Sequence, residues 1–272
     1  MDKRPIGIFD SGIGGLTVAN AIRKKLPNES LVYFGDTAHM PYGDKSPELI
    51  RHYSARIAHY LMTFDCKMIV IACNTASSHA FSTVAAVVGP DIPVVNVIDP
   101  VVDYVVKHHN KDKVGVIGTK GTIESRVYPR RIQKADKSIK VASLATPLLA
   151  PMIEEGFVNN MISRTVIHSY LDKTALRGID ALILGCTHYP LIRKEVASYY
   201  KNPVEILDST LLVAEEVEQI LTAKDMLNDA SSSSHRFMVS DYTEAFEKST
   251  RLFFKEKLEL TESRIWDNRN FG

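Results

Sequence analysis

Residues 68–77, MIVIACNTAS, and residues 181–190, ALILGCTHYP, decide the fold of this chain. Each stretch begins with a short apolar run typical of a buried strand and continues into a polar segment typical of a helix start. Cys73 and Cys186 are therefore predicted at strand-to-helix turns, where open α/β sheets bind their ligands. A thiol at a helix N-terminus lies among unpaired N–H groups, which stabilise its thiolate form. Two such thiols in matching positions predict a pair of acid/base groups that face one substrate.

The rest of the chain repeats this alternation of short apolar runs with longer helical stretches. The alternation is typical of βαβ units and parallel sheets, so we expect an α/β protein. The expected strands are residues 6–9, 31–34, 68–72, 94–97, 114–117, 141–144, 181–184, 204–207 and 237–239.

A faint internal repeat divides the chain into two halves. Ile6–Gly12 resembles Val114–Lys120, and each segment is followed further on by a strand that ends in a cysteine. Two similar halves predict two related α/β domains. The residues after Asp208 hold a helical run around Leu211–Leu221, one strand and a further helix, which is too little for a third domain. We expect this segment to pack back onto one of the halves.

Composition narrows the class of protein. The 272 residues are 45% hydrophobic and 24% charged, as in a globular protein with an ample core. A net charge of +1 gives no electrostatic argument for a nucleic acid or a membrane as partner. Residues 1–8 lack the features of a signal peptide, and no apolar run approaches the ~18 residues of a membrane span. Three cysteines without CxxC spacing argue against a disulfide framework and a zinc site, so we expect a cytoplasmic protein with reduced thiols and no metal.

The Gly-rich string DSGIGGLT at residues 10–17 allows three interpretations. A dinucleotide fingerprint, helped by Asp36, is weak because Thr17 stands where GxGxxG needs its third glycine. Alternatively, the loop N–H groups and the Ser11 hydroxyl bind a carboxylate, which leaves Asp10 for proton chemistry or for orienting an amine. The third interpretation is a tight turn capped by Asp10 or Ser11. The later loop Pro41-Tyr42-Gly43 is equally compatible with a ligand wall and with a structural turn.

The cysteines carry the functional argument. Most single cysteines are buried and structural, and Cys66 fits that description. Cys73 and Cys186 differ because they share a strand-end position and are followed by polar residues. A Cys186–His188 nucleophile for acyl transfer is conceivable, but it would leave Cys73 without a role. His188 could instead hydrogen-bond the Cys186 thiol or a substrate carboxylate.

Five motifs together resemble those of the bacterial glutamate racemase family. They are, in chain order, FDSGIGGLT at 9–17, GDTA at 35–38, PYG at 41–43, CNTA at 73–76 and GCTHYP at 185–190. Each motif alone is modestly specific, whereas all five in family order over most of the chain are strongly so. The chain departs from the family at Ala38-His39-Met40, where other members often carry arginine.

The resemblance implies two flavodoxin-like parallel-sheet domains related by pseudo-twofold symmetry, with the active site in the cleft between them. Residues 1–97 and 208–272 would form the first domain, and residues 98–207 the second. The implied activity is cofactor-independent racemisation of L-glutamate to D-glutamate, a small-molecule substrate, for peptidoglycan synthesis. The family also implies a homodimer.

The resemblance assigns roles to single residues as well. Cys73 and Cys186 would be the two acid/base groups, with Asp10 assisting Cys73, and with His188 and Glu154 assisting Cys186. Glu154 is carried over from the string Ile153-Glu154-Glu155, where its neighbour Glu155 could be confused with it. The residues implied to position the substrate are Asp10, Ser11, Pro41, Tyr42, Gly43, Asn74, Thr75, Cys186, Thr187 and His188.

The chemistry of the residues agrees with this role. Inverting an α-carbon requires proton removal on one face and delivery on the other, and a thiol pKa of about 8.5 is close enough to neutrality for this work. Two alternatives stay open. The same paired cysteines could serve a racemase or isomerase of aspartate, a hydantoin or maleate. A two-domain glutamate-binding protein without catalysis would use the same cleft.

Overall fold

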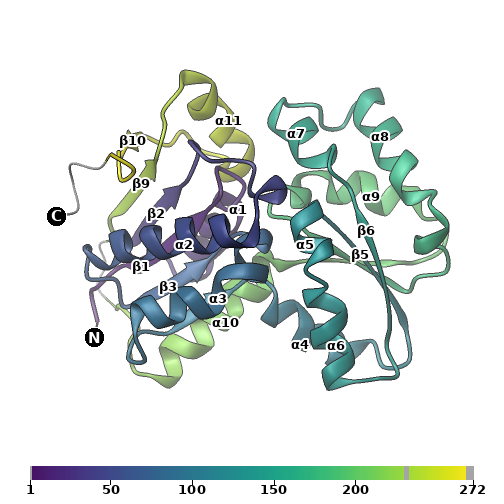
Figure 1. The fold of residues 1–272 in the computed structure, drawn as a ribbon, viewed down its shortest axis with the longest axis horizontal. Helices are drawn as coiled ribbons and strands as arrows, with labels where there is room; N and C mark the ends of the chain where they lie inside the picture. Colours follow the sequence, from purple (N-terminus) through teal and green to yellow (C-terminus); the bar gives the residue numbers. More distant parts are fainter. Residues whose placement is uncertain (1, 230–232, 268–272) are drawn as a thin grey trace.

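The computed structural model describes residues 2–229 and 233–267, and it contains two parallel β-sheets flanked by helices (Figure 1). The strands are β1 (Ile6–Asp10), β2 (Leu31–Gly35), β3 (Met68–Ile71), β4 (Val94–Asn96), β5 (Lys113–Gly118), β6 (Lys140–Ala145), β7 (Ala181–Gly185), β8 (Glu205–Asp208), β9 (His235–Val239) and β10 (Leu260–Glu262). The α-helices are α1 (Leu16–Lys25), α2 (Pro47–Met62), α3 (Asn74–Val88), α4 (Asp99–His108), α5 (Lys120–Glu124), α6 (Val127–Ala135), α7 (Leu149–Glu154), α8 (Met161–Leu171), α9 (Arg193–Tyr199), α10 (Ser209–Ala223) and α11 (Glu244–Phe254). Short 3₁₀ helices follow β2 at Tyr42–Asp44 and β7 at Tyr189–Ile192.

The two sheets repeat one strand order. The first sheet runs β10-β9-β2-β1-β3-β4 and the second β6-β5-β7-β8, with every pairing parallel. The order second-first-third-fourth therefore occurs twice, which is the topology expected of two related halves. The α/β fold class predicted from the sequence is confirmed, and all nine predicted strands are present.

The C-terminal segment returns to the first sheet. β9 pairs with β2 in parallel, from Leu31 beside His235 to Gly35 beside Val239, and β10 extends the edge beyond β9. The expectation that this segment packs back onto one half is thus confirmed. The strand β10 was not predicted, because three residues of sequence Leu-Thr-Glu carry no strand pattern.

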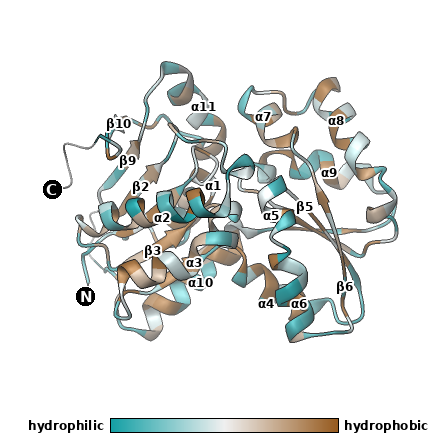
Figure 2. Ribbon diagram, in the orientation of Figure 1, coloured by the Kyte–Doolittle hydropathy of each residue, from teal (hydrophilic) through white to brown (hydrophobic). Residues whose placement is uncertain are grey.

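The buried core joins the two halves. One face of the first sheet contributes Ile8 to an apolar cluster that continues through Val101 of α4 to Val114 and Leu182 of the second sheet. The opposite face of the first sheet packs under α2 and α3 in a separate cluster that contains Phe9. Figure 2 shows the apolar strands at the centre of each half and polar residues on the outer helix faces. Within the described part of the chain, no helix is long and apolar enough to cross a membrane.

Candidate active site

Cys73 follows β3 directly and is the N-cap residue of α3, as the sequence predicts. Its backbone is extended and the next residues turn into the helix, so the sulfur accepts the N–H of Ala76 at 3.4 Å. The thiol also donates to the Ser11 hydroxyl at 3.6 Å. Burial and the charge of Asp10 raise the pKa of Cys73 to about 12, and the hydrogen bonds that Cys73 makes with Ala76 and Ser11 offset only part of that rise. The helix N-terminus thus favours the thiolate through the Ala76 N–H, as expected, but desolvation outweighs this effect and the net shift of the Cys73 pKa is upward.

Cys186 follows β7 in the matching position of the second sheet. The residues after it form a turn and a 3₁₀ helix rather than an α-helix, so the predicted α-helix start is absent at Cys186. The Cys186 sulfur contacts a histidine instead of the N–H groups of an α-helix. It lies 3.5 Å from His188 Nδ1, and His188 Nε2 lies 2.8 Å from Glu154 Oε1. Glu154 is the last residue of α7, whereas the neighbouring Glu155 is exposed to solvent. The three groups form one chain of contacts that ends at the sulfur.

The charge of His188 depends on these neighbours. Burial alone would lower the pKa of His188, but the negative charges and hydrogen bonds of Cys186 and Glu154 raise it well above 6.5. A doubly protonated His188 can donate to the sulfur and to the carboxylate at the same time. The Phe253 ring of α11 covers the imidazole edge-on, with ring centroids 5.2 Å apart.

Replacing Glu154 with glutamine tests this arrangement. Glu154→Gln removes one of the groups that raise the pKa of His188, so we expect the His188 pKa to fall toward its ordinary value. NMR titration of the His188 ring measures this directly, with Glu155→Gln as the matched control. An unchanged titration in Glu154→Gln, or an equal shift in Glu155→Gln, would mean that Glu154 does not hold the proton on His188.

Asp10 lies at the end of β1 and is fully buried. Its Oδ2 accepts the N–H groups of Gly12 at 3.2 Å and Gly15 at 2.9 Å. Asp10 therefore caps the Gly-rich turn, the structural interpretation of this string, and two of the loop N–H groups are not free for a ligand carboxylate. Its Oδ1 is buried without a hydrogen-bond partner among the described residues. Burial raises the pKa of Asp10, although the charge of His188 opposes the shift.

Both thiols open into one cavity of about 140 Å³. The cavity is lined by Ser11, Gly12, Met40, Pro41, Tyr42, Gly43, Cys73, Asn74, Thr75, Thr119, Ala150, Pro151, Glu154, Cys186, Thr187 and His188. Every residue predicted for the site from the sequence lies in this lining except Asp10, which is fully buried. Thr119 was not predicted, although the internal repeat aligns it with Ser11.

Asp36 holds the loop that carries Pro41 and Tyr42. This fully buried carboxylate accepts four hydrogen bonds, at 2.7 to 3.0 Å: from the Tyr42 hydroxyl, the His39 ring, the Ser240 hydroxyl and the Trp266 indole. From the sequence, Asp36 is expected only to help a dinucleotide site. Its partners from the C-terminal segment are more than two hundred residues away, so no local pattern reveals them.

Removing this carboxylate has a clear expected cost. Asp36→Ala leaves several buried donors without an acceptor, and we expect it to lower the free energy of unfolding by about 3 kcal/mol. Chemical denaturation measures the loss. Asp44→Ala is the matched control, because Asp44 is exposed and its ion pair with Lys120 is worth at most about 1 kcal/mol. Equal stability of the two variants would contradict a structural role of Asp36.

Several hydrogen bonds connect the two halves around the cavity. The Thr17 hydroxyl donates to the carbonyl oxygen of Thr187 at 3.0 Å, and the Thr75 and Thr119 hydroxyl oxygens lie 2.8 Å apart. Gly14 allows the closest approach, because a Cβ there would overlap the His188 ring and lie 2.8 Å from Thr187 Oγ1. The cavity is therefore formed by both halves together.

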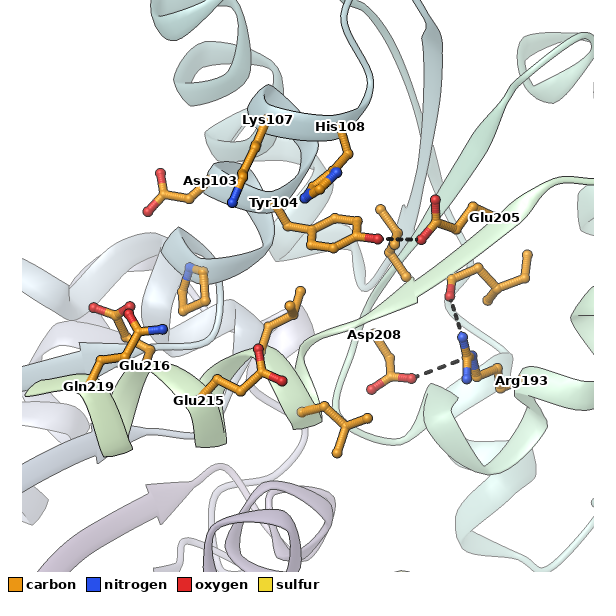
Figure 3. Close-up of a pocket in the computed structure, with 15 residues that line it drawn as sticks. Asp103, Tyr104, Lys107, His108, Arg193, Glu205, Asp208, Glu215, Glu216 and Gln219 are labelled. Atoms are coloured by element: carbon orange, nitrogen blue, oxygen red, sulfur yellow. Dashed lines mark hydrogen bonds and ion pairs between the residues drawn. The ribbon is translucent and has the colours of Figure 1, made fainter. Parts of the chain in front are cut away.

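A wider hollow of about 550 Å³ lies at the connections between the halves, lined from α4, β8, α10 and the start of α9 (Figure 3). Tyr104 donates to Glu205 at 2.7 Å across it, and Arg193 lies 3.6 Å from Asp208. Its described lining contains no cysteine and none of the assigned site residues. Over residues 2–229 and 233–267, no group of three or more His, Cys, Asp or Glu side chains is arranged to hold a metal ion. Cys73 and Cys186 thus both line the smaller cavity and not the wide hollow.

Comparison with known proteins agrees with this geometry. Residues 16–217 match the Asp/Glu/Hydantoin racemase family. The chain belongs to this family. Glutamate racemase of Geobacter metallireducens is 40% identical over 259 residues, which cover 95% of each chain. The crystal structure of Francisella tularensis glutamate racemase in complex with D-glutamate superposes on this racemase-family fold with a TM-score of 0.92 and 38% identity, covering 97% of this chain and 99% of that one. The Thermus thermophilus glutamate racemase in complex with β-chloro-D-alanine has a TM-score of 0.87 and 37% identity, covering 97% and 98%.

Proposed function

We propose that this chain racemises glutamate without a cofactor, with Cys73 and Cys186 as the two acid/base groups. The observation that carries the proposal is the placement of two thiols, one from each sheet, in the lining of one small cavity. One thiol removes the α-proton from one face of the substrate, and the other delivers a proton to the opposite face. The reverse direction exchanges the two roles.

The surroundings of each thiol support this division. Burial and the charge of Asp10 favour the thiol form of Cys73, since they raise its pKa to about 12. A bound amino acid brings an ammonium group, and an opposite charge within ~4–6 Å favours the thiolate. Asp10, whose charge acts on Cys73, would assist that side. His188 and Glu154 would assist Cys186 by holding and returning a proton along their chain of contacts.

The cavity also supports a small amino acid as substrate. The α-proton of an amino acid is far less acidic than a thiol, so donors must stabilise the developing carbanion and water must be excluded. The lining supplies the hydroxyls of Ser11, Thr75 and Thr187 together with the side chain of Asn74. We assign substrate positioning to these residues, to the Pro41-Tyr42-Gly43 loop and to Asp10, Cys186 and His188. The curated relatives described above are glutamate racemases, which favours glutamate among small acidic amino acids.

We also propose the domain boundaries, the cellular compartment and the use of the product. We place the domain boundaries at 97/98 and 207/208, which separate the two sheets except for Asp208, the last residue of β8. We place the reaction in the cytoplasm, where the three free cysteines stay reduced. D-Glutamate would be used in peptidoglycan synthesis.

We also propose a homodimer. Apolar side chains at α7 and α8 support it: Leu148, Phe157, Met161 and Ile162 are exposed, Met161 at 81%. Light scattering that gives the mass of a single chain would exclude the dimer.

Circular dichroism of the amino acid tests the activity. Without added cofactor, the circular dichroism of L-glutamate and that of D-glutamate should each decay to zero, the value of the racemic mixture. The signal of L-aspartate should stay constant. Loss of the aspartate signal instead would reassign the substrate within the family. Stable signals from both amino acids, with glutamate bound by the folded protein, would indicate a binding protein without catalysis.

A further inference from the structure

We propose that Tyr128 is a positioning residue for the site, because its hydroxyl fixes the side-chain amide of Asn74 with the N–H groups toward the cavity. The inference deepens the proposed function, since it rests on Asn74 being a substrate contact. Tyr128 belongs to α6 in the second half, and Asn74 begins α3 in the first half. Neither the repeat nor any motif in the sequence indicates this pairing.

The hydrogen bond between Tyr128 and Asn74 is short and buried. Tyr128 Oη donates to Asn74 Oδ1 at 2.7 Å, and the two residues are 2% and 3% exposed. Asn74 Nδ2 is buried and has no hydrogen-bond partner among the described residues. An unpaired buried donor is costly and rare, so this amide points to an acceptor that arrives with a ligand.

Tyr128 decides which end of the amide faces the ligand. Asn74 Oδ1 is the one acceptor that the Tyr128 hydroxyl has among the described residues. Turning the amide over would leave the buried hydroxyl hydrogen unpaired, and buried tyrosine hydroxyls almost always find a partner. The phenol therefore holds Oδ1 away from the cavity and leaves both amide hydrogens for the ligand.

The composition of the cavity makes this orientation matter. Its described lining contains no lysine or arginine, and His188 is its one side chain able to carry a positive charge. Recognition of a substrate carboxylate then falls to neutral donors, of which the Asn74 amide is one. A donor held in place before binding contributes more affinity than one that must first rotate. Because the bond crosses between the halves, the amide is set when the halves adopt this arrangement.

Tyr128→Phe tests the proposal with the ring left in place. We expect KM for glutamate to rise about tenfold, the effect of one hydrogen bond, with kcat within about threefold of the wild type. The two enantiomers have equal free energy, so kcat/KM must fall by the same factor in both directions. Tyr104→Phe is the control, because its hydroxyl makes an equally short bond to Glu205 at the wide hollow. A loss in kcat alone, or an equal rise in KM in Tyr104→Phe, would overturn the assignment.

A double-mutant cycle separates positioning from general packing. Asn74→Ala should raise KM by at least as much as Tyr128→Phe, and adding Tyr128→Phe to Asn74→Ala should change KM no further. Additive effects would mean that Tyr128 acts by another route and would overturn the proposal. Unfolding midpoints of all four proteins identify any variant that is merely unstable.

A readout without turnover distinguishes this inference from the proposed function. The side-chain amide resonances of Asn74, assigned by their loss in Asn74→Ala, should shift in Tyr128→Phe and stay in place in Tyr104→Phe. Unchanged resonances in Tyr128→Phe would refute the positioning role even in an active enzyme. If the wild type does not racemise glutamate, yet the Asn74 resonances shift in Tyr128→Phe, the proposed function is refuted and the Tyr128–Asn74 arrangement stands.

Discussion

Replacing either Cys73 or Cys186 with alanine is expected to lower glutamate racemisation about 10³-fold or more in both directions. Each substitution removes the acid/base group on one face of the substrate, and a positioned proton-transfer group contributes ~10²–10⁴-fold. Circular dichroism measures the loss. Cys66→Ala is the matched control, because this third buried thiol donates to the carbonyl of Leu61 outside the cavity. It should keep wild-type activity.

Each single variant should still remove the α-proton from one face of the substrate, because one thiol remains. Elimination of chloride from a 3-chloroglutamate needs one base, which removes the α-proton while chloride leaves the β-carbon. Each variant should therefore process one enantiomer at the α-carbon, and the two variants should prefer opposite ones. Racemisation that survives in both variants would refute the two-thiol mechanism. A shared preference for one enantiomer would place both thiols on the same face.

Gly14→Ala has the second largest expected effect, a fall in kcat/KM of about 10²-fold. A Cβ at this position would overlap the His188 ring and lie 2.8 Å from Thr187 Oγ1, so the loop that carries Cys186 must shift. A displacement of about 1 Å from a catalytic geometry can cost ~10²-fold in rate. The NMR titration of His188 gives a second readout. Its pKa should fall if the ring leaves Cys186 and Glu154.

His188→Ala supplies the internal control for Gly14. Removing the ring relieves the closest overlap of the added methyl group and leaves the contact with Thr187 Oγ1 at 2.8 Å, so Gly14→Ala should cost less in this background than in the wild type. An equal cost in both backgrounds would show that Gly14 matters for the Gly-rich turn or for Thr187 rather than for the approach of His188.

The fold follows closely from the pattern of the sequence. Apolar runs and their spacing predict nine strands because parallel strands are buried on both faces and leave a strong local signal. The repeat between Ile6–Gly12 and Val114–Lys120 predicts two related α/β halves, and the strand order that the two sheets share agrees with this. The sequence pattern does not predict strand β10, because this strand is short and polar and lies at a sheet edge. Its pairing with β9 is set by the tertiary structure.

The site is predicted in part. Cys73 and Cys186 emerge from their matched strand ends, and the family motifs supply Glu154, which spacing alone does not favour. Asp36, Tyr128 and the role of Gly14 depend on partners that are far away in the sequence or in the other half. The pKa of Cys73 also departs from expectation, because the helix N-terminus is visible in the sequence whereas complete burial of the thiol is not.

Racemisation of L-glutamate in deuterated water tests the central claim most directly. NMR follows deuterium at the α-carbon of the D-glutamate formed and of the L-glutamate remaining during the first few per cent of reaction. Two thiols on opposite faces predict deuterium in the new D-glutamate and little in the remaining L-glutamate, and the mirror-image result from D-glutamate. Transfer of the substrate's own proton into the product, or equal deuterium in both pools from the start, would indicate a single base and would contradict the two-thiol mechanism.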